Sequence, residues 1–199
     1  MTDNSADAEA SWQHLKPDSV HALQTLLMTI ESDAPPGDLF ETYVWSKSVL
    51  AKAMRARLEM HLPSECPTFW ELRDRVAEAI MRKFGESIPV KYLKVPYKSS
   101  VHIALFAILL EKIGEPVESA MLRVVTEDSV HTERRMRELR ELGFDITPIE
   151  MRGIDFYKLG SLNINETLIP AIVKNNIRKD KSISAETRRD LESKFSSGN

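Results

Sequence analysis

The spacing of apolar residues changes at Gly143, and this change limits the folds that the chain can adopt. The apolar residues are Met136, Leu139 and Leu142 before Gly143, and Phe144, Ile146, Ile149 and Met151 after it. The first set recurs every three residues, which predicts a helix with one apolar stripe. The second set alternates as in a strand, is interrupted at Pro148, and resumes at Ile149 and Met151. Arg152-Gly153 then predicts a turn before a returning strand, Ile154 to Leu159. The chain must therefore combine helices with a small sheet.

Two more helices are expected just upstream of this segment. Ser99-Ser100 would cap a helix through VHIALFAILLEKI, which is apolar on most faces and therefore expected to be buried. After the turn at Gly114-Glu115-Pro116, a shorter helix is expected from about Val117 to Val125. Three helices followed by a hairpin, within residues 99–160, predict a winged helix-turn-helix. In such folds the third helix lies in the major groove of DNA.

The remaining segments are expected to be mostly helical. Residues 1–10 are small, polar and acidic, and predict a disordered tail. Residues 11–85 predict a bundle of three helices, and 86–98 a basic connector with a short edge strand. Residues 161–199 predict a basic C-terminal segment with a helix. The expected fold class is thus mainly α with a small β-hairpin (α+β).

Charge is unevenly distributed along the chain, whose net charge is −3. Counted from the sequence, residues 1–72 carry −6, 73–98 carry +4, 99–160 carry −3 and 161–199 carry +2. A protein that holds DNA mainly by charge should be basic throughout. Any contact with nucleic acid must therefore come from local basic patches.

Several classes of protein are disfavoured by what the sequence contains. No apolar run reaches the length of about 18 residues typical of a membrane-spanning helix, and the N-terminus does not resemble a signal peptide, so a cytoplasmic protein without membrane contact is expected. Cys66 is the only cysteine, and the five histidines are scattered. No GxSxG, P-loop or HExxH motif is present. We therefore expect no catalytic residues, no metal and no cofactor, and His102 is expected to be a core residue.

The stretch TERRMRELRELGFDI, residues 132–146, permits two interpretations. Arg134–Glu138 and Arg137–Glu141 are spaced to form ion pairs on an exposed helix that binds nothing. If the apolar stripe faces inward, however, Arg134, Arg135, Arg137, Glu138 and Glu141 should point outward. The hairpin that directly follows Gly143 favours DNA contact, because a merely solvated helix does not need one.

Longer stretches of the second half resemble a known family. The stretches are VHIALFAILLEKIGEPV, RRMRELRELGFDI and FYKLGSL, followed by IRKDKSISAETRRDLESKF. They resemble the winged-helix specificity domain on the N-terminal side of HNH-type restriction endonucleases, and the basic lead-in to the nuclease. The resemblance covers about residues 99–195 and implies binding of duplex DNA through Arg134, Arg135 and Arg152. The paired histidines and the zinc ribbon of that nuclease are missing from this sequence.

These observations together predict a duplex DNA-binding protein, either a regulator or the specificity component of a restriction or defence system. The residues expected to contact DNA are His131, Thr132, Arg134, Arg135, Arg137, Glu138, Arg152, Lys158, Lys179 and Lys181, with Lys174 and Arg178 as further phosphate contacts. Its expected partners are double-stranded DNA and either a second copy of the chain or a separate nuclease subunit. The alternatives are a protein-interaction module built on a winged helix and, less favoured, an enzyme hidden in the helical half.

Overall fold

The computed structural model describes residues 3–62, 65–127 and 131–195. Parts of the expected tail and of the basic C-terminal segment, at residues 1–2 and 196–199, lie outside this description. The chain divides into two compact units. Unit 1 consists of residues 1–65 and 117–132, and unit 2 consists of residues 66–116 and 133–199.

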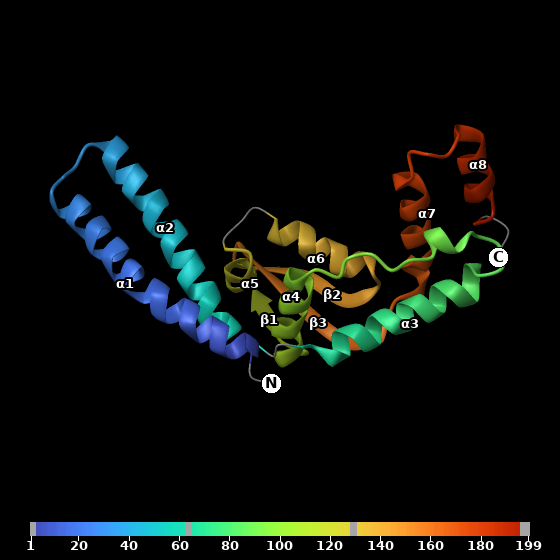
Figure 1. Ribbon diagram of the computed structural model, residues 1–199, viewed down its shortest axis with the longest axis horizontal. Helices are drawn as coiled ribbons and strands as arrows, with labels where there is room; N and C mark the ends of the chain where they lie inside the picture. Colours follow the sequence, from blue (N-terminus) through green and yellow to red (C-terminus); the bar gives the residue numbers. More distant parts are fainter. Residues whose placement is uncertain (1–2, 63–64, 128–130, 196–199) are drawn as a thin grey trace. The chain divides into compact units, whose positions relative to one another are not determined.

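Helices dominate both units (Figure 1). In unit 1 they are α1 (Asp3–Glu31), α2 (Pro36–Glu59) and α5 (Ser119–Val125). In unit 2 they are α3 (Pro67–Phe84), α4 (Ser100–Glu111), α7 (Ile169–Lys179), α8 (Ala185–Ser193) and the 3-10 turns η1 (Val90–Tyr92) and η2 (Glu166–Leu168). Helix α6 (Thr132–Glu141) begins at the boundary. The strands are β1 (Pro116–Glu118), β2 (Phe144–Met151) and β3 (Ile154–Ile164). The predicted class, mainly α with a small β-hairpin, is confirmed.

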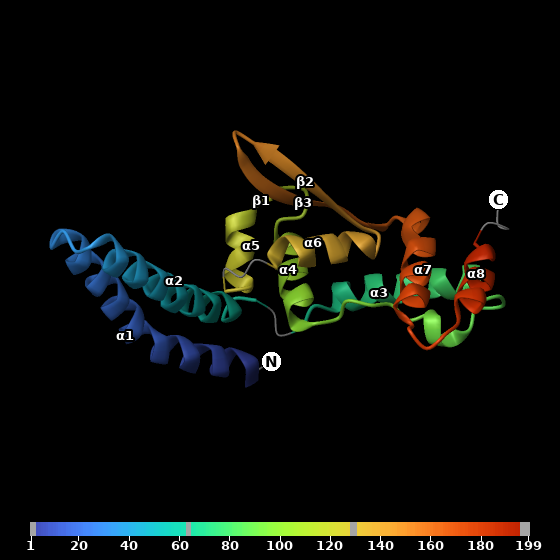
Figure 2. The same ribbon diagram turned by 90° about the horizontal axis from the view of Figure 1, so that it is seen from above.

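Helices α1 and α2 of unit 1 pack side by side along their length (Figures 1 and 2). Small residues such as Ala22 and Ala53 are fully buried, and the Ser46 hydroxyl donates a 3.0 Å hydrogen bond to the Ala22 carbonyl. Helix α1 already starts at Asp3 and continues through Pro17, so most of the segment expected to be a tail is helical. Its turns before Lys16 pack against α2, since Ala8 is buried.

Large apolar side chains remain exposed on this pair of helices. They are Val20, Leu23, Leu27, Met28 and Ile30 on α1, and Phe40, Tyr43, Val44, Trp45 and Met54 on α2. Exposed apolar side chains gathered on one pair of helices are typical of interaction surfaces. This region therefore contrasts with the well-packed core of unit 2.

The core of unit 2 is built around three phenylalanine rings. Phe69 of α3, Phe106 of α4 and Phe144 of β2 lie with their ring centroids 5.3–5.9 Å apart. The predicted apolar stripe of α6 faces this core, because Met136, Leu139 and Leu142 are all fully buried. Helix α3 thus belongs to unit 2 and not to a bundle with α1 and α2. Helix α3 packs against α4, α7 and strand β3.

Leu142 and Gly143 connect α6 to the hairpin, and Gly143 adopts a left-handed conformation. Gly143 has φ +87°, and a Cβ there would lie 2.8 Å from the Asn165 carbonyl oxygen. Strands β2 and β3 pair antiparallel from Met151↔Ile154 outward, with a register shift near Asp145, and the strand order of the sheet is β1-β3-β2. Arg152 and Gly153 both have positive φ at the predicted turn, as in a type I′ hairpin.

Residues 86–98 form a connector, but the predicted edge strand is wrong. After the 3-10 turn η1 the chain is extended without a ladder partner among the described residues. Its carbonyls are instead occupied by side chains. The buried guanidinium of Arg73 donates to the carbonyls of Val95, Pro96 and Tyr97, and the Asn176 amide donates to those of Tyr92 and Lys94. This segment is fixed against α3 and α7 of unit 2 by these bonds.

Candidate nucleic-acid interface

Helix α6 carries four arginines, and its helical spacing decides which of them reach solvent. Met136, Leu139 and Leu142 occupy the buried side, so neighbouring positions on the opposite side are exposed. The side chains of Arg134 and Arg137 are 60% and 65% exposed, and that of Arg135 is 34% exposed. Arg140 is also exposed. The outward orientation expected for Arg134 and Arg137 is therefore observed, and Arg135, for which it is also expected, is partly exposed.

The outward orientation expected for Glu138 is wrong. Glu138 is only 5% exposed, and Thr132 at the start of the helix is 1% exposed. Glu138 turns inward because a buried polar group on α4, the imidazole of His102, needs a partner. Thr132 lies 2.5 Å, hydroxyl to hydroxyl, from Thr126.

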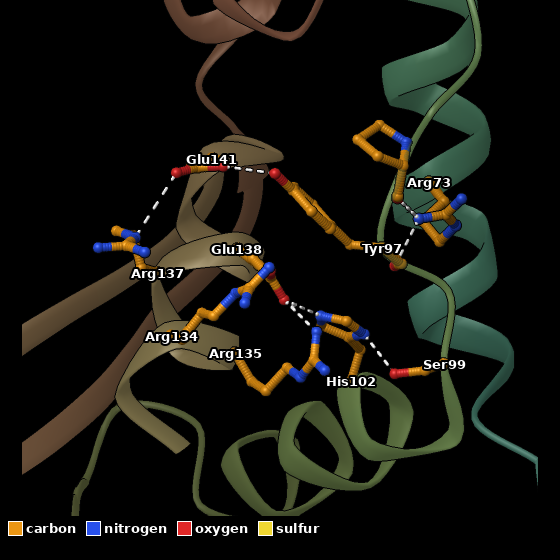
Figure 3. A network of polar contacts seen from close by, with 10 residues as sticks. Arg73, Tyr97, Ser99, His102, Arg134, Arg135, Arg137, Glu138 and Glu141 are labelled. Atoms are coloured by element: carbon orange, nitrogen blue, oxygen red, sulfur yellow. Dashed lines mark hydrogen bonds and ion pairs between the residues drawn. The ribbon is translucent and has the colours of Figure 1, made fainter. Parts of the chain in front are cut away.

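His102 hydrogen-bonds Ser99 and Glu138, and the buried bond to Glu138 links α4 to α6 (Figure 3). Its Nε2 lies 2.9 Å from Glu138 Oε2, and its Nδ1 lies 2.6 Å from the Ser99 hydroxyl. Burial lowers the pKa of His102, and the positive charges of Arg135 and Arg73 act in the same direction against the opposing effect of Glu138. The imidazole is therefore neutral near pH 7, with Nε2–H donating to the carboxylate and Nδ1 accepting from Ser99. The expectation that His102 is a core residue is confirmed.

Glu138 also holds the two arginines that open the helix. Arg134 donates through Nε to Oε1 at 3.0 Å, and Arg135 donates through Nη1 to Oε2 at 2.8 Å. Although burial acts in the opposite direction, hydrogen bonds from Arg135, His102 and Arg134 lower the pKa of Glu138. The carboxylate therefore remains ionised and restricts both guanidinium groups to one region of the surface.

A second polar cluster lies one turn further along α6. The Tyr97 hydroxyl donates a 2.7 Å hydrogen bond to Glu141 Oε2, and Arg137 Nε lies 3.8 Å from Glu141 Oε1. Burial and the neighbouring Glu141 raise the pKa of Tyr97 far above its ordinary value, so the phenol stays protonated. Figure 3 shows both clusters along the same helix, with the Arg134, Arg135 and Arg137 side chains on it.

The other residues expected to contact DNA lie on different elements. Arg152 is exposed at the hairpin turn, Lys158 is half-buried on β3, and His131 is exposed just before α6. Lys179 and Lys181 are exposed at and after the end of α7. Of these, Lys179 is brought close to α6, because it lines one pocket together with Arg137 and Arg140. Two further expected contacts have intramolecular partners: Lys174 lies over the Phe195 ring, and Arg178 pairs with Glu192 at 2.9 Å.

Sequence reasoning missed the buried link between His102 and Glu138, and the roles of Arg73 and Tyr97. One signal was available for the first. A histidine within an otherwise apolar helix requires a buried hydrogen-bond partner, and a polar residue flanking the apolar stripe of α6 could have been that partner. No local pattern marks Arg73, because its partners are backbone carbonyls 22 to 24 residues away.

Neither a metal centre nor a membrane segment is found in the part of the chain that the structure describes. Within residues 3–62, 65–127 and 131–195, no three His, Cys, Asp or Glu side chains are grouped as metal ligands would be. Among the same residues, no helix combines the length and the hydropathy needed to cross a bilayer.

Comparison with known proteins relates one segment of the chain to a restriction endonuclease-related family. A protein-family model described as KpnI N-terminal domain matches residues 103–161. The matched segment resembles that domain. It contains most of α4, then β1, α5, α6 and β2, and ends within β3, so the KpnI-like segment links the chain to a restriction endonuclease-related family. No curated protein and no solved structure matches the chain.

Proposed function

We propose that this protein binds duplex DNA through a winged helix-turn-helix, residues 99–160, with α6 in the major groove. The observation that carries the proposal is the exposed arginine face of α6, which is followed directly by a two-stranded hairpin and lies within the KpnI-like segment. The element order α4, β1, α5, α6, β2, β3 also supports it, since it is the order of helices and hairpin expected for this fold.

Arg134 is the best placed residue for reading a base. Glu138 engages its Nε, and among the described residues neither terminal nitrogen of the guanidinium fork has a hydrogen-bond partner. That fork is the group that pairs bidentately with guanine O6 and N7. A guanidinium fixed by a carboxylate also loses less side-chain entropy on binding. Glu138 is thus proposed as a positioning residue and not, as its sequence position implied, as a DNA contact.

Arg152, Lys158, Lys179 and Lys181 are proposed as phosphate contacts. Arg152 stands at the hairpin turn, and Lys179 and Lys181 are exposed at the end of α7. Contacts of this kind fix the register of a protein on duplex DNA without reading its sequence. They provide local positive charge in a chain whose net charge is −3.

Equilibrium binding to duplexes selected from a random library tests the proposal. The double variant Arg134→Ala/Arg135→Ala should lose preference for the selected duplex by about 10-fold or more. Lys179→Ala should weaken selected and unrelated duplexes alike. The proposal would be contradicted if selection at low salt enriched no duplex, or if the double variant bound the selected duplex with unchanged affinity. A protein-interaction module would then be the better supported function.

We further propose that the bound protein acts in a restriction or defence system in the cytoplasm, as the component that finds the DNA. The KpnI-like segment supports this role, and the sequence contains no nuclease motif that we recognise. A separate nuclease subunit would then supply cleavage. Co-purification of such a nuclease with the tagged protein from its native cells tests the role.

We also propose that the protein pairs with a second copy through α1 and α2. Exposed Leu23, Leu27 and Phe40 support pairing, because two such pairs of helices can bury these side chains in a four-helix bundle. Two copies would enlarge the DNA site. Sedimentation should give twice the chain mass for the wild type and one chain mass for Leu23→Glu/Leu27→Glu. A wild type that sediments as one chain at high concentration would exclude the dimer.

A further inference from the structure

A pocket of about 290 Å³ lies beside the arginine face of α6. It shares Arg137 and Lys179 with the proposed duplex interface, but its apolar wall and Tyr97 have no part in that interface. Residues from α6, from the connector and from α7 line it, all of them in unit 2. Helix α7 presents one face to the pocket, since its lining residues recur every three or four positions. They are Leu168 just before α7, and Ala171, Ile172, Asn175, Asn176 and Lys179 within it.

Tyr97 in the wall of this pocket is held at its backbone carbonyl and at its hydroxyl. Its backbone has φ +61°, a conformation that residues other than glycine rarely adopt. The buried Arg73 stabilises this conformation by donating to the Tyr97 carbonyl at 2.7 Å and to the Val95 carbonyl. The Tyr97 hydroxyl donates to Glu141. Figure 3 shows the ring between these two contacts. Strained residues fixed in this way cluster at ligand-binding sites.

The lining of the pocket combines an apolar wall with a positive rim. Pro96, Leu168, Ala171 and Ile172 provide the apolar part. Arg137, Arg140 and Lys179 provide three cations against the single carboxylate of Glu141, which accepts from the Tyr97 hydroxyl and pairs with Arg137 at 3.8 Å. Such a site suits a ligand with a flat apolar body and an anionic group.

We propose that the pocket binds one unpaired nucleotide. Its base would lie against the apolar wall and Tyr97, with its edge toward the Asn175 amide, and its phosphate would pair with Arg137, Arg140 and Lys179. Aromatic walls beside cations are a common arrangement for unpaired nucleotides. Lys179 Nζ now lies 5.5 Å from the centre of the Tyr97 ring, and its exposed, flexible side chain can turn to the phosphate. The same unit can come from a free mononucleotide or from a DNA strand with an unpaired base.

Calorimetric titration of the full chain with four free deoxynucleoside monophosphates, a short single strand and a fully paired duplex tests the proposal. Ala171→Trp should fill the pocket and lower affinity for the single strand or the mononucleotide at least 10-fold. Ala185→Trp, an exposed position on α8 outside the pocket lining, is the matched control and should bind as the wild type does. Tyr97→Asn, which removes the ring but tolerates the positive φ, should also bind more weakly.

Each arm of the experiment separates one source of the ligand. Saturable binding of a monophosphate identifies a free nucleotide, and binding of the single strand alone identifies an unpaired base within DNA. The proposal would be overturned if neither a monophosphate nor the single strand bound, or if Ala171→Trp bound them as tightly as the wild type does. The pocket shares Arg137 and Lys179 with the proposed duplex interface, but binding of an unpaired nucleotide does not require binding of a duplex. The two fail separately, because loss of duplex binding with retained mononucleotide binding contradicts only the winged-helix proposal.

Discussion

At the scale of single residues, His102 and Glu138 determine what the exposed arginines can do. The neutral imidazole in the first turn of α4 needs an acceptor, and the acceptor on α6, Glu138, also binds Arg134 and Arg135. The stability of the core and the placement of the arginines therefore depend on one carboxylate.

Glu138→Ala should lower the free energy of unfolding and release Arg134 and Arg135 from their shared partner. It leaves the buried imidazole without its partner, at a cost of about 1–3 kcal/mol in unfolding free energy, measurable by urea unfolding.

Acid should destabilise the protein partly through His102. Its pKa in the folded state lies below its ordinary value, so below pH of about 6.5 the unfolded chain takes up a proton that the folded chain does not. The stabilising contribution is complete above that pH and falls as pH decreases toward the folded-state pKa. His102→Gln keeps a donor toward Glu138 and removes the titration.

Urea unfolding at pH 7 and pH 5.5 checks this pH dependence. His102→Gln should lose less unfolding free energy between the two values than the wild type does. His21→Gln, an exposed position on α1, is the control and should follow the wild type. A loss as large in His102→Gln as in the wild type would show that His102 does not titrate in this range.

At the scale of elements, the junction between α6 and β2 depends on Gly143. Gly143→Ala should destabilise the protein by about 1–3 kcal/mol, because φ is +87° and the added Cβ would meet the Asn165 backbone. Gly37→Ala is the matched control, since a Cβ there meets nothing within 4 Å. Thermal unfolding of the two variants should therefore show a lower Tm for the first alone. Equal Tm values would mean that the junction can adjust.

The hairpin turn allows stability and DNA binding to be separated. Arg152→Asn creates an Asn-Gly turn, which type I′ hairpins prefer, and removes the proposed phosphate contact. The variant should unfold at a Tm equal to or above that of the wild type. The slope of the logarithm of the duplex binding constant against the logarithm of salt concentration should decrease in magnitude by about 1. An unchanged salt dependence would exclude Arg152 from the interface.

The sequence predicts local elements well where each depends on its own pattern. The stripe of Met136, Leu139 and Leu142, the turn at Arg152-Gly153 and the helix after Ser99 are all observed. The errors concern long-range partners. Glu138 turns inward because of His102, 36 residues away, and the carbonyls of residues 95–97 are occupied by Arg73 and not by a neighbouring strand. No spacing rule within one element carries this information.

At the scale of the whole molecule, positive charge is local. The chain has a net charge of −3, and its largest net negative charge, −6, lies in residues 1–72, whereas the proposed DNA contacts lie on α6, the hairpin and the end of α7. Binding should therefore be directed to a small part of unit 2 and should depend on few phosphate contacts. The exposed apolar residues of α1 and α2 leave unit 1 available for pairing with another chain.

Site-specific photo-crosslinking to duplex DNA tests the central proposal most directly. A photoreactive residue would replace Arg137 on α6, Arg152 at the hairpin turn or, as a control, Glu186 on α8 in the full-length chain. The proposed major-groove position of α6 requires crosslinks from positions 137 and 152 and few from position 186. Equal crosslinking from all three positions, or none from position 137 under conditions where the duplex is bound, would contradict it.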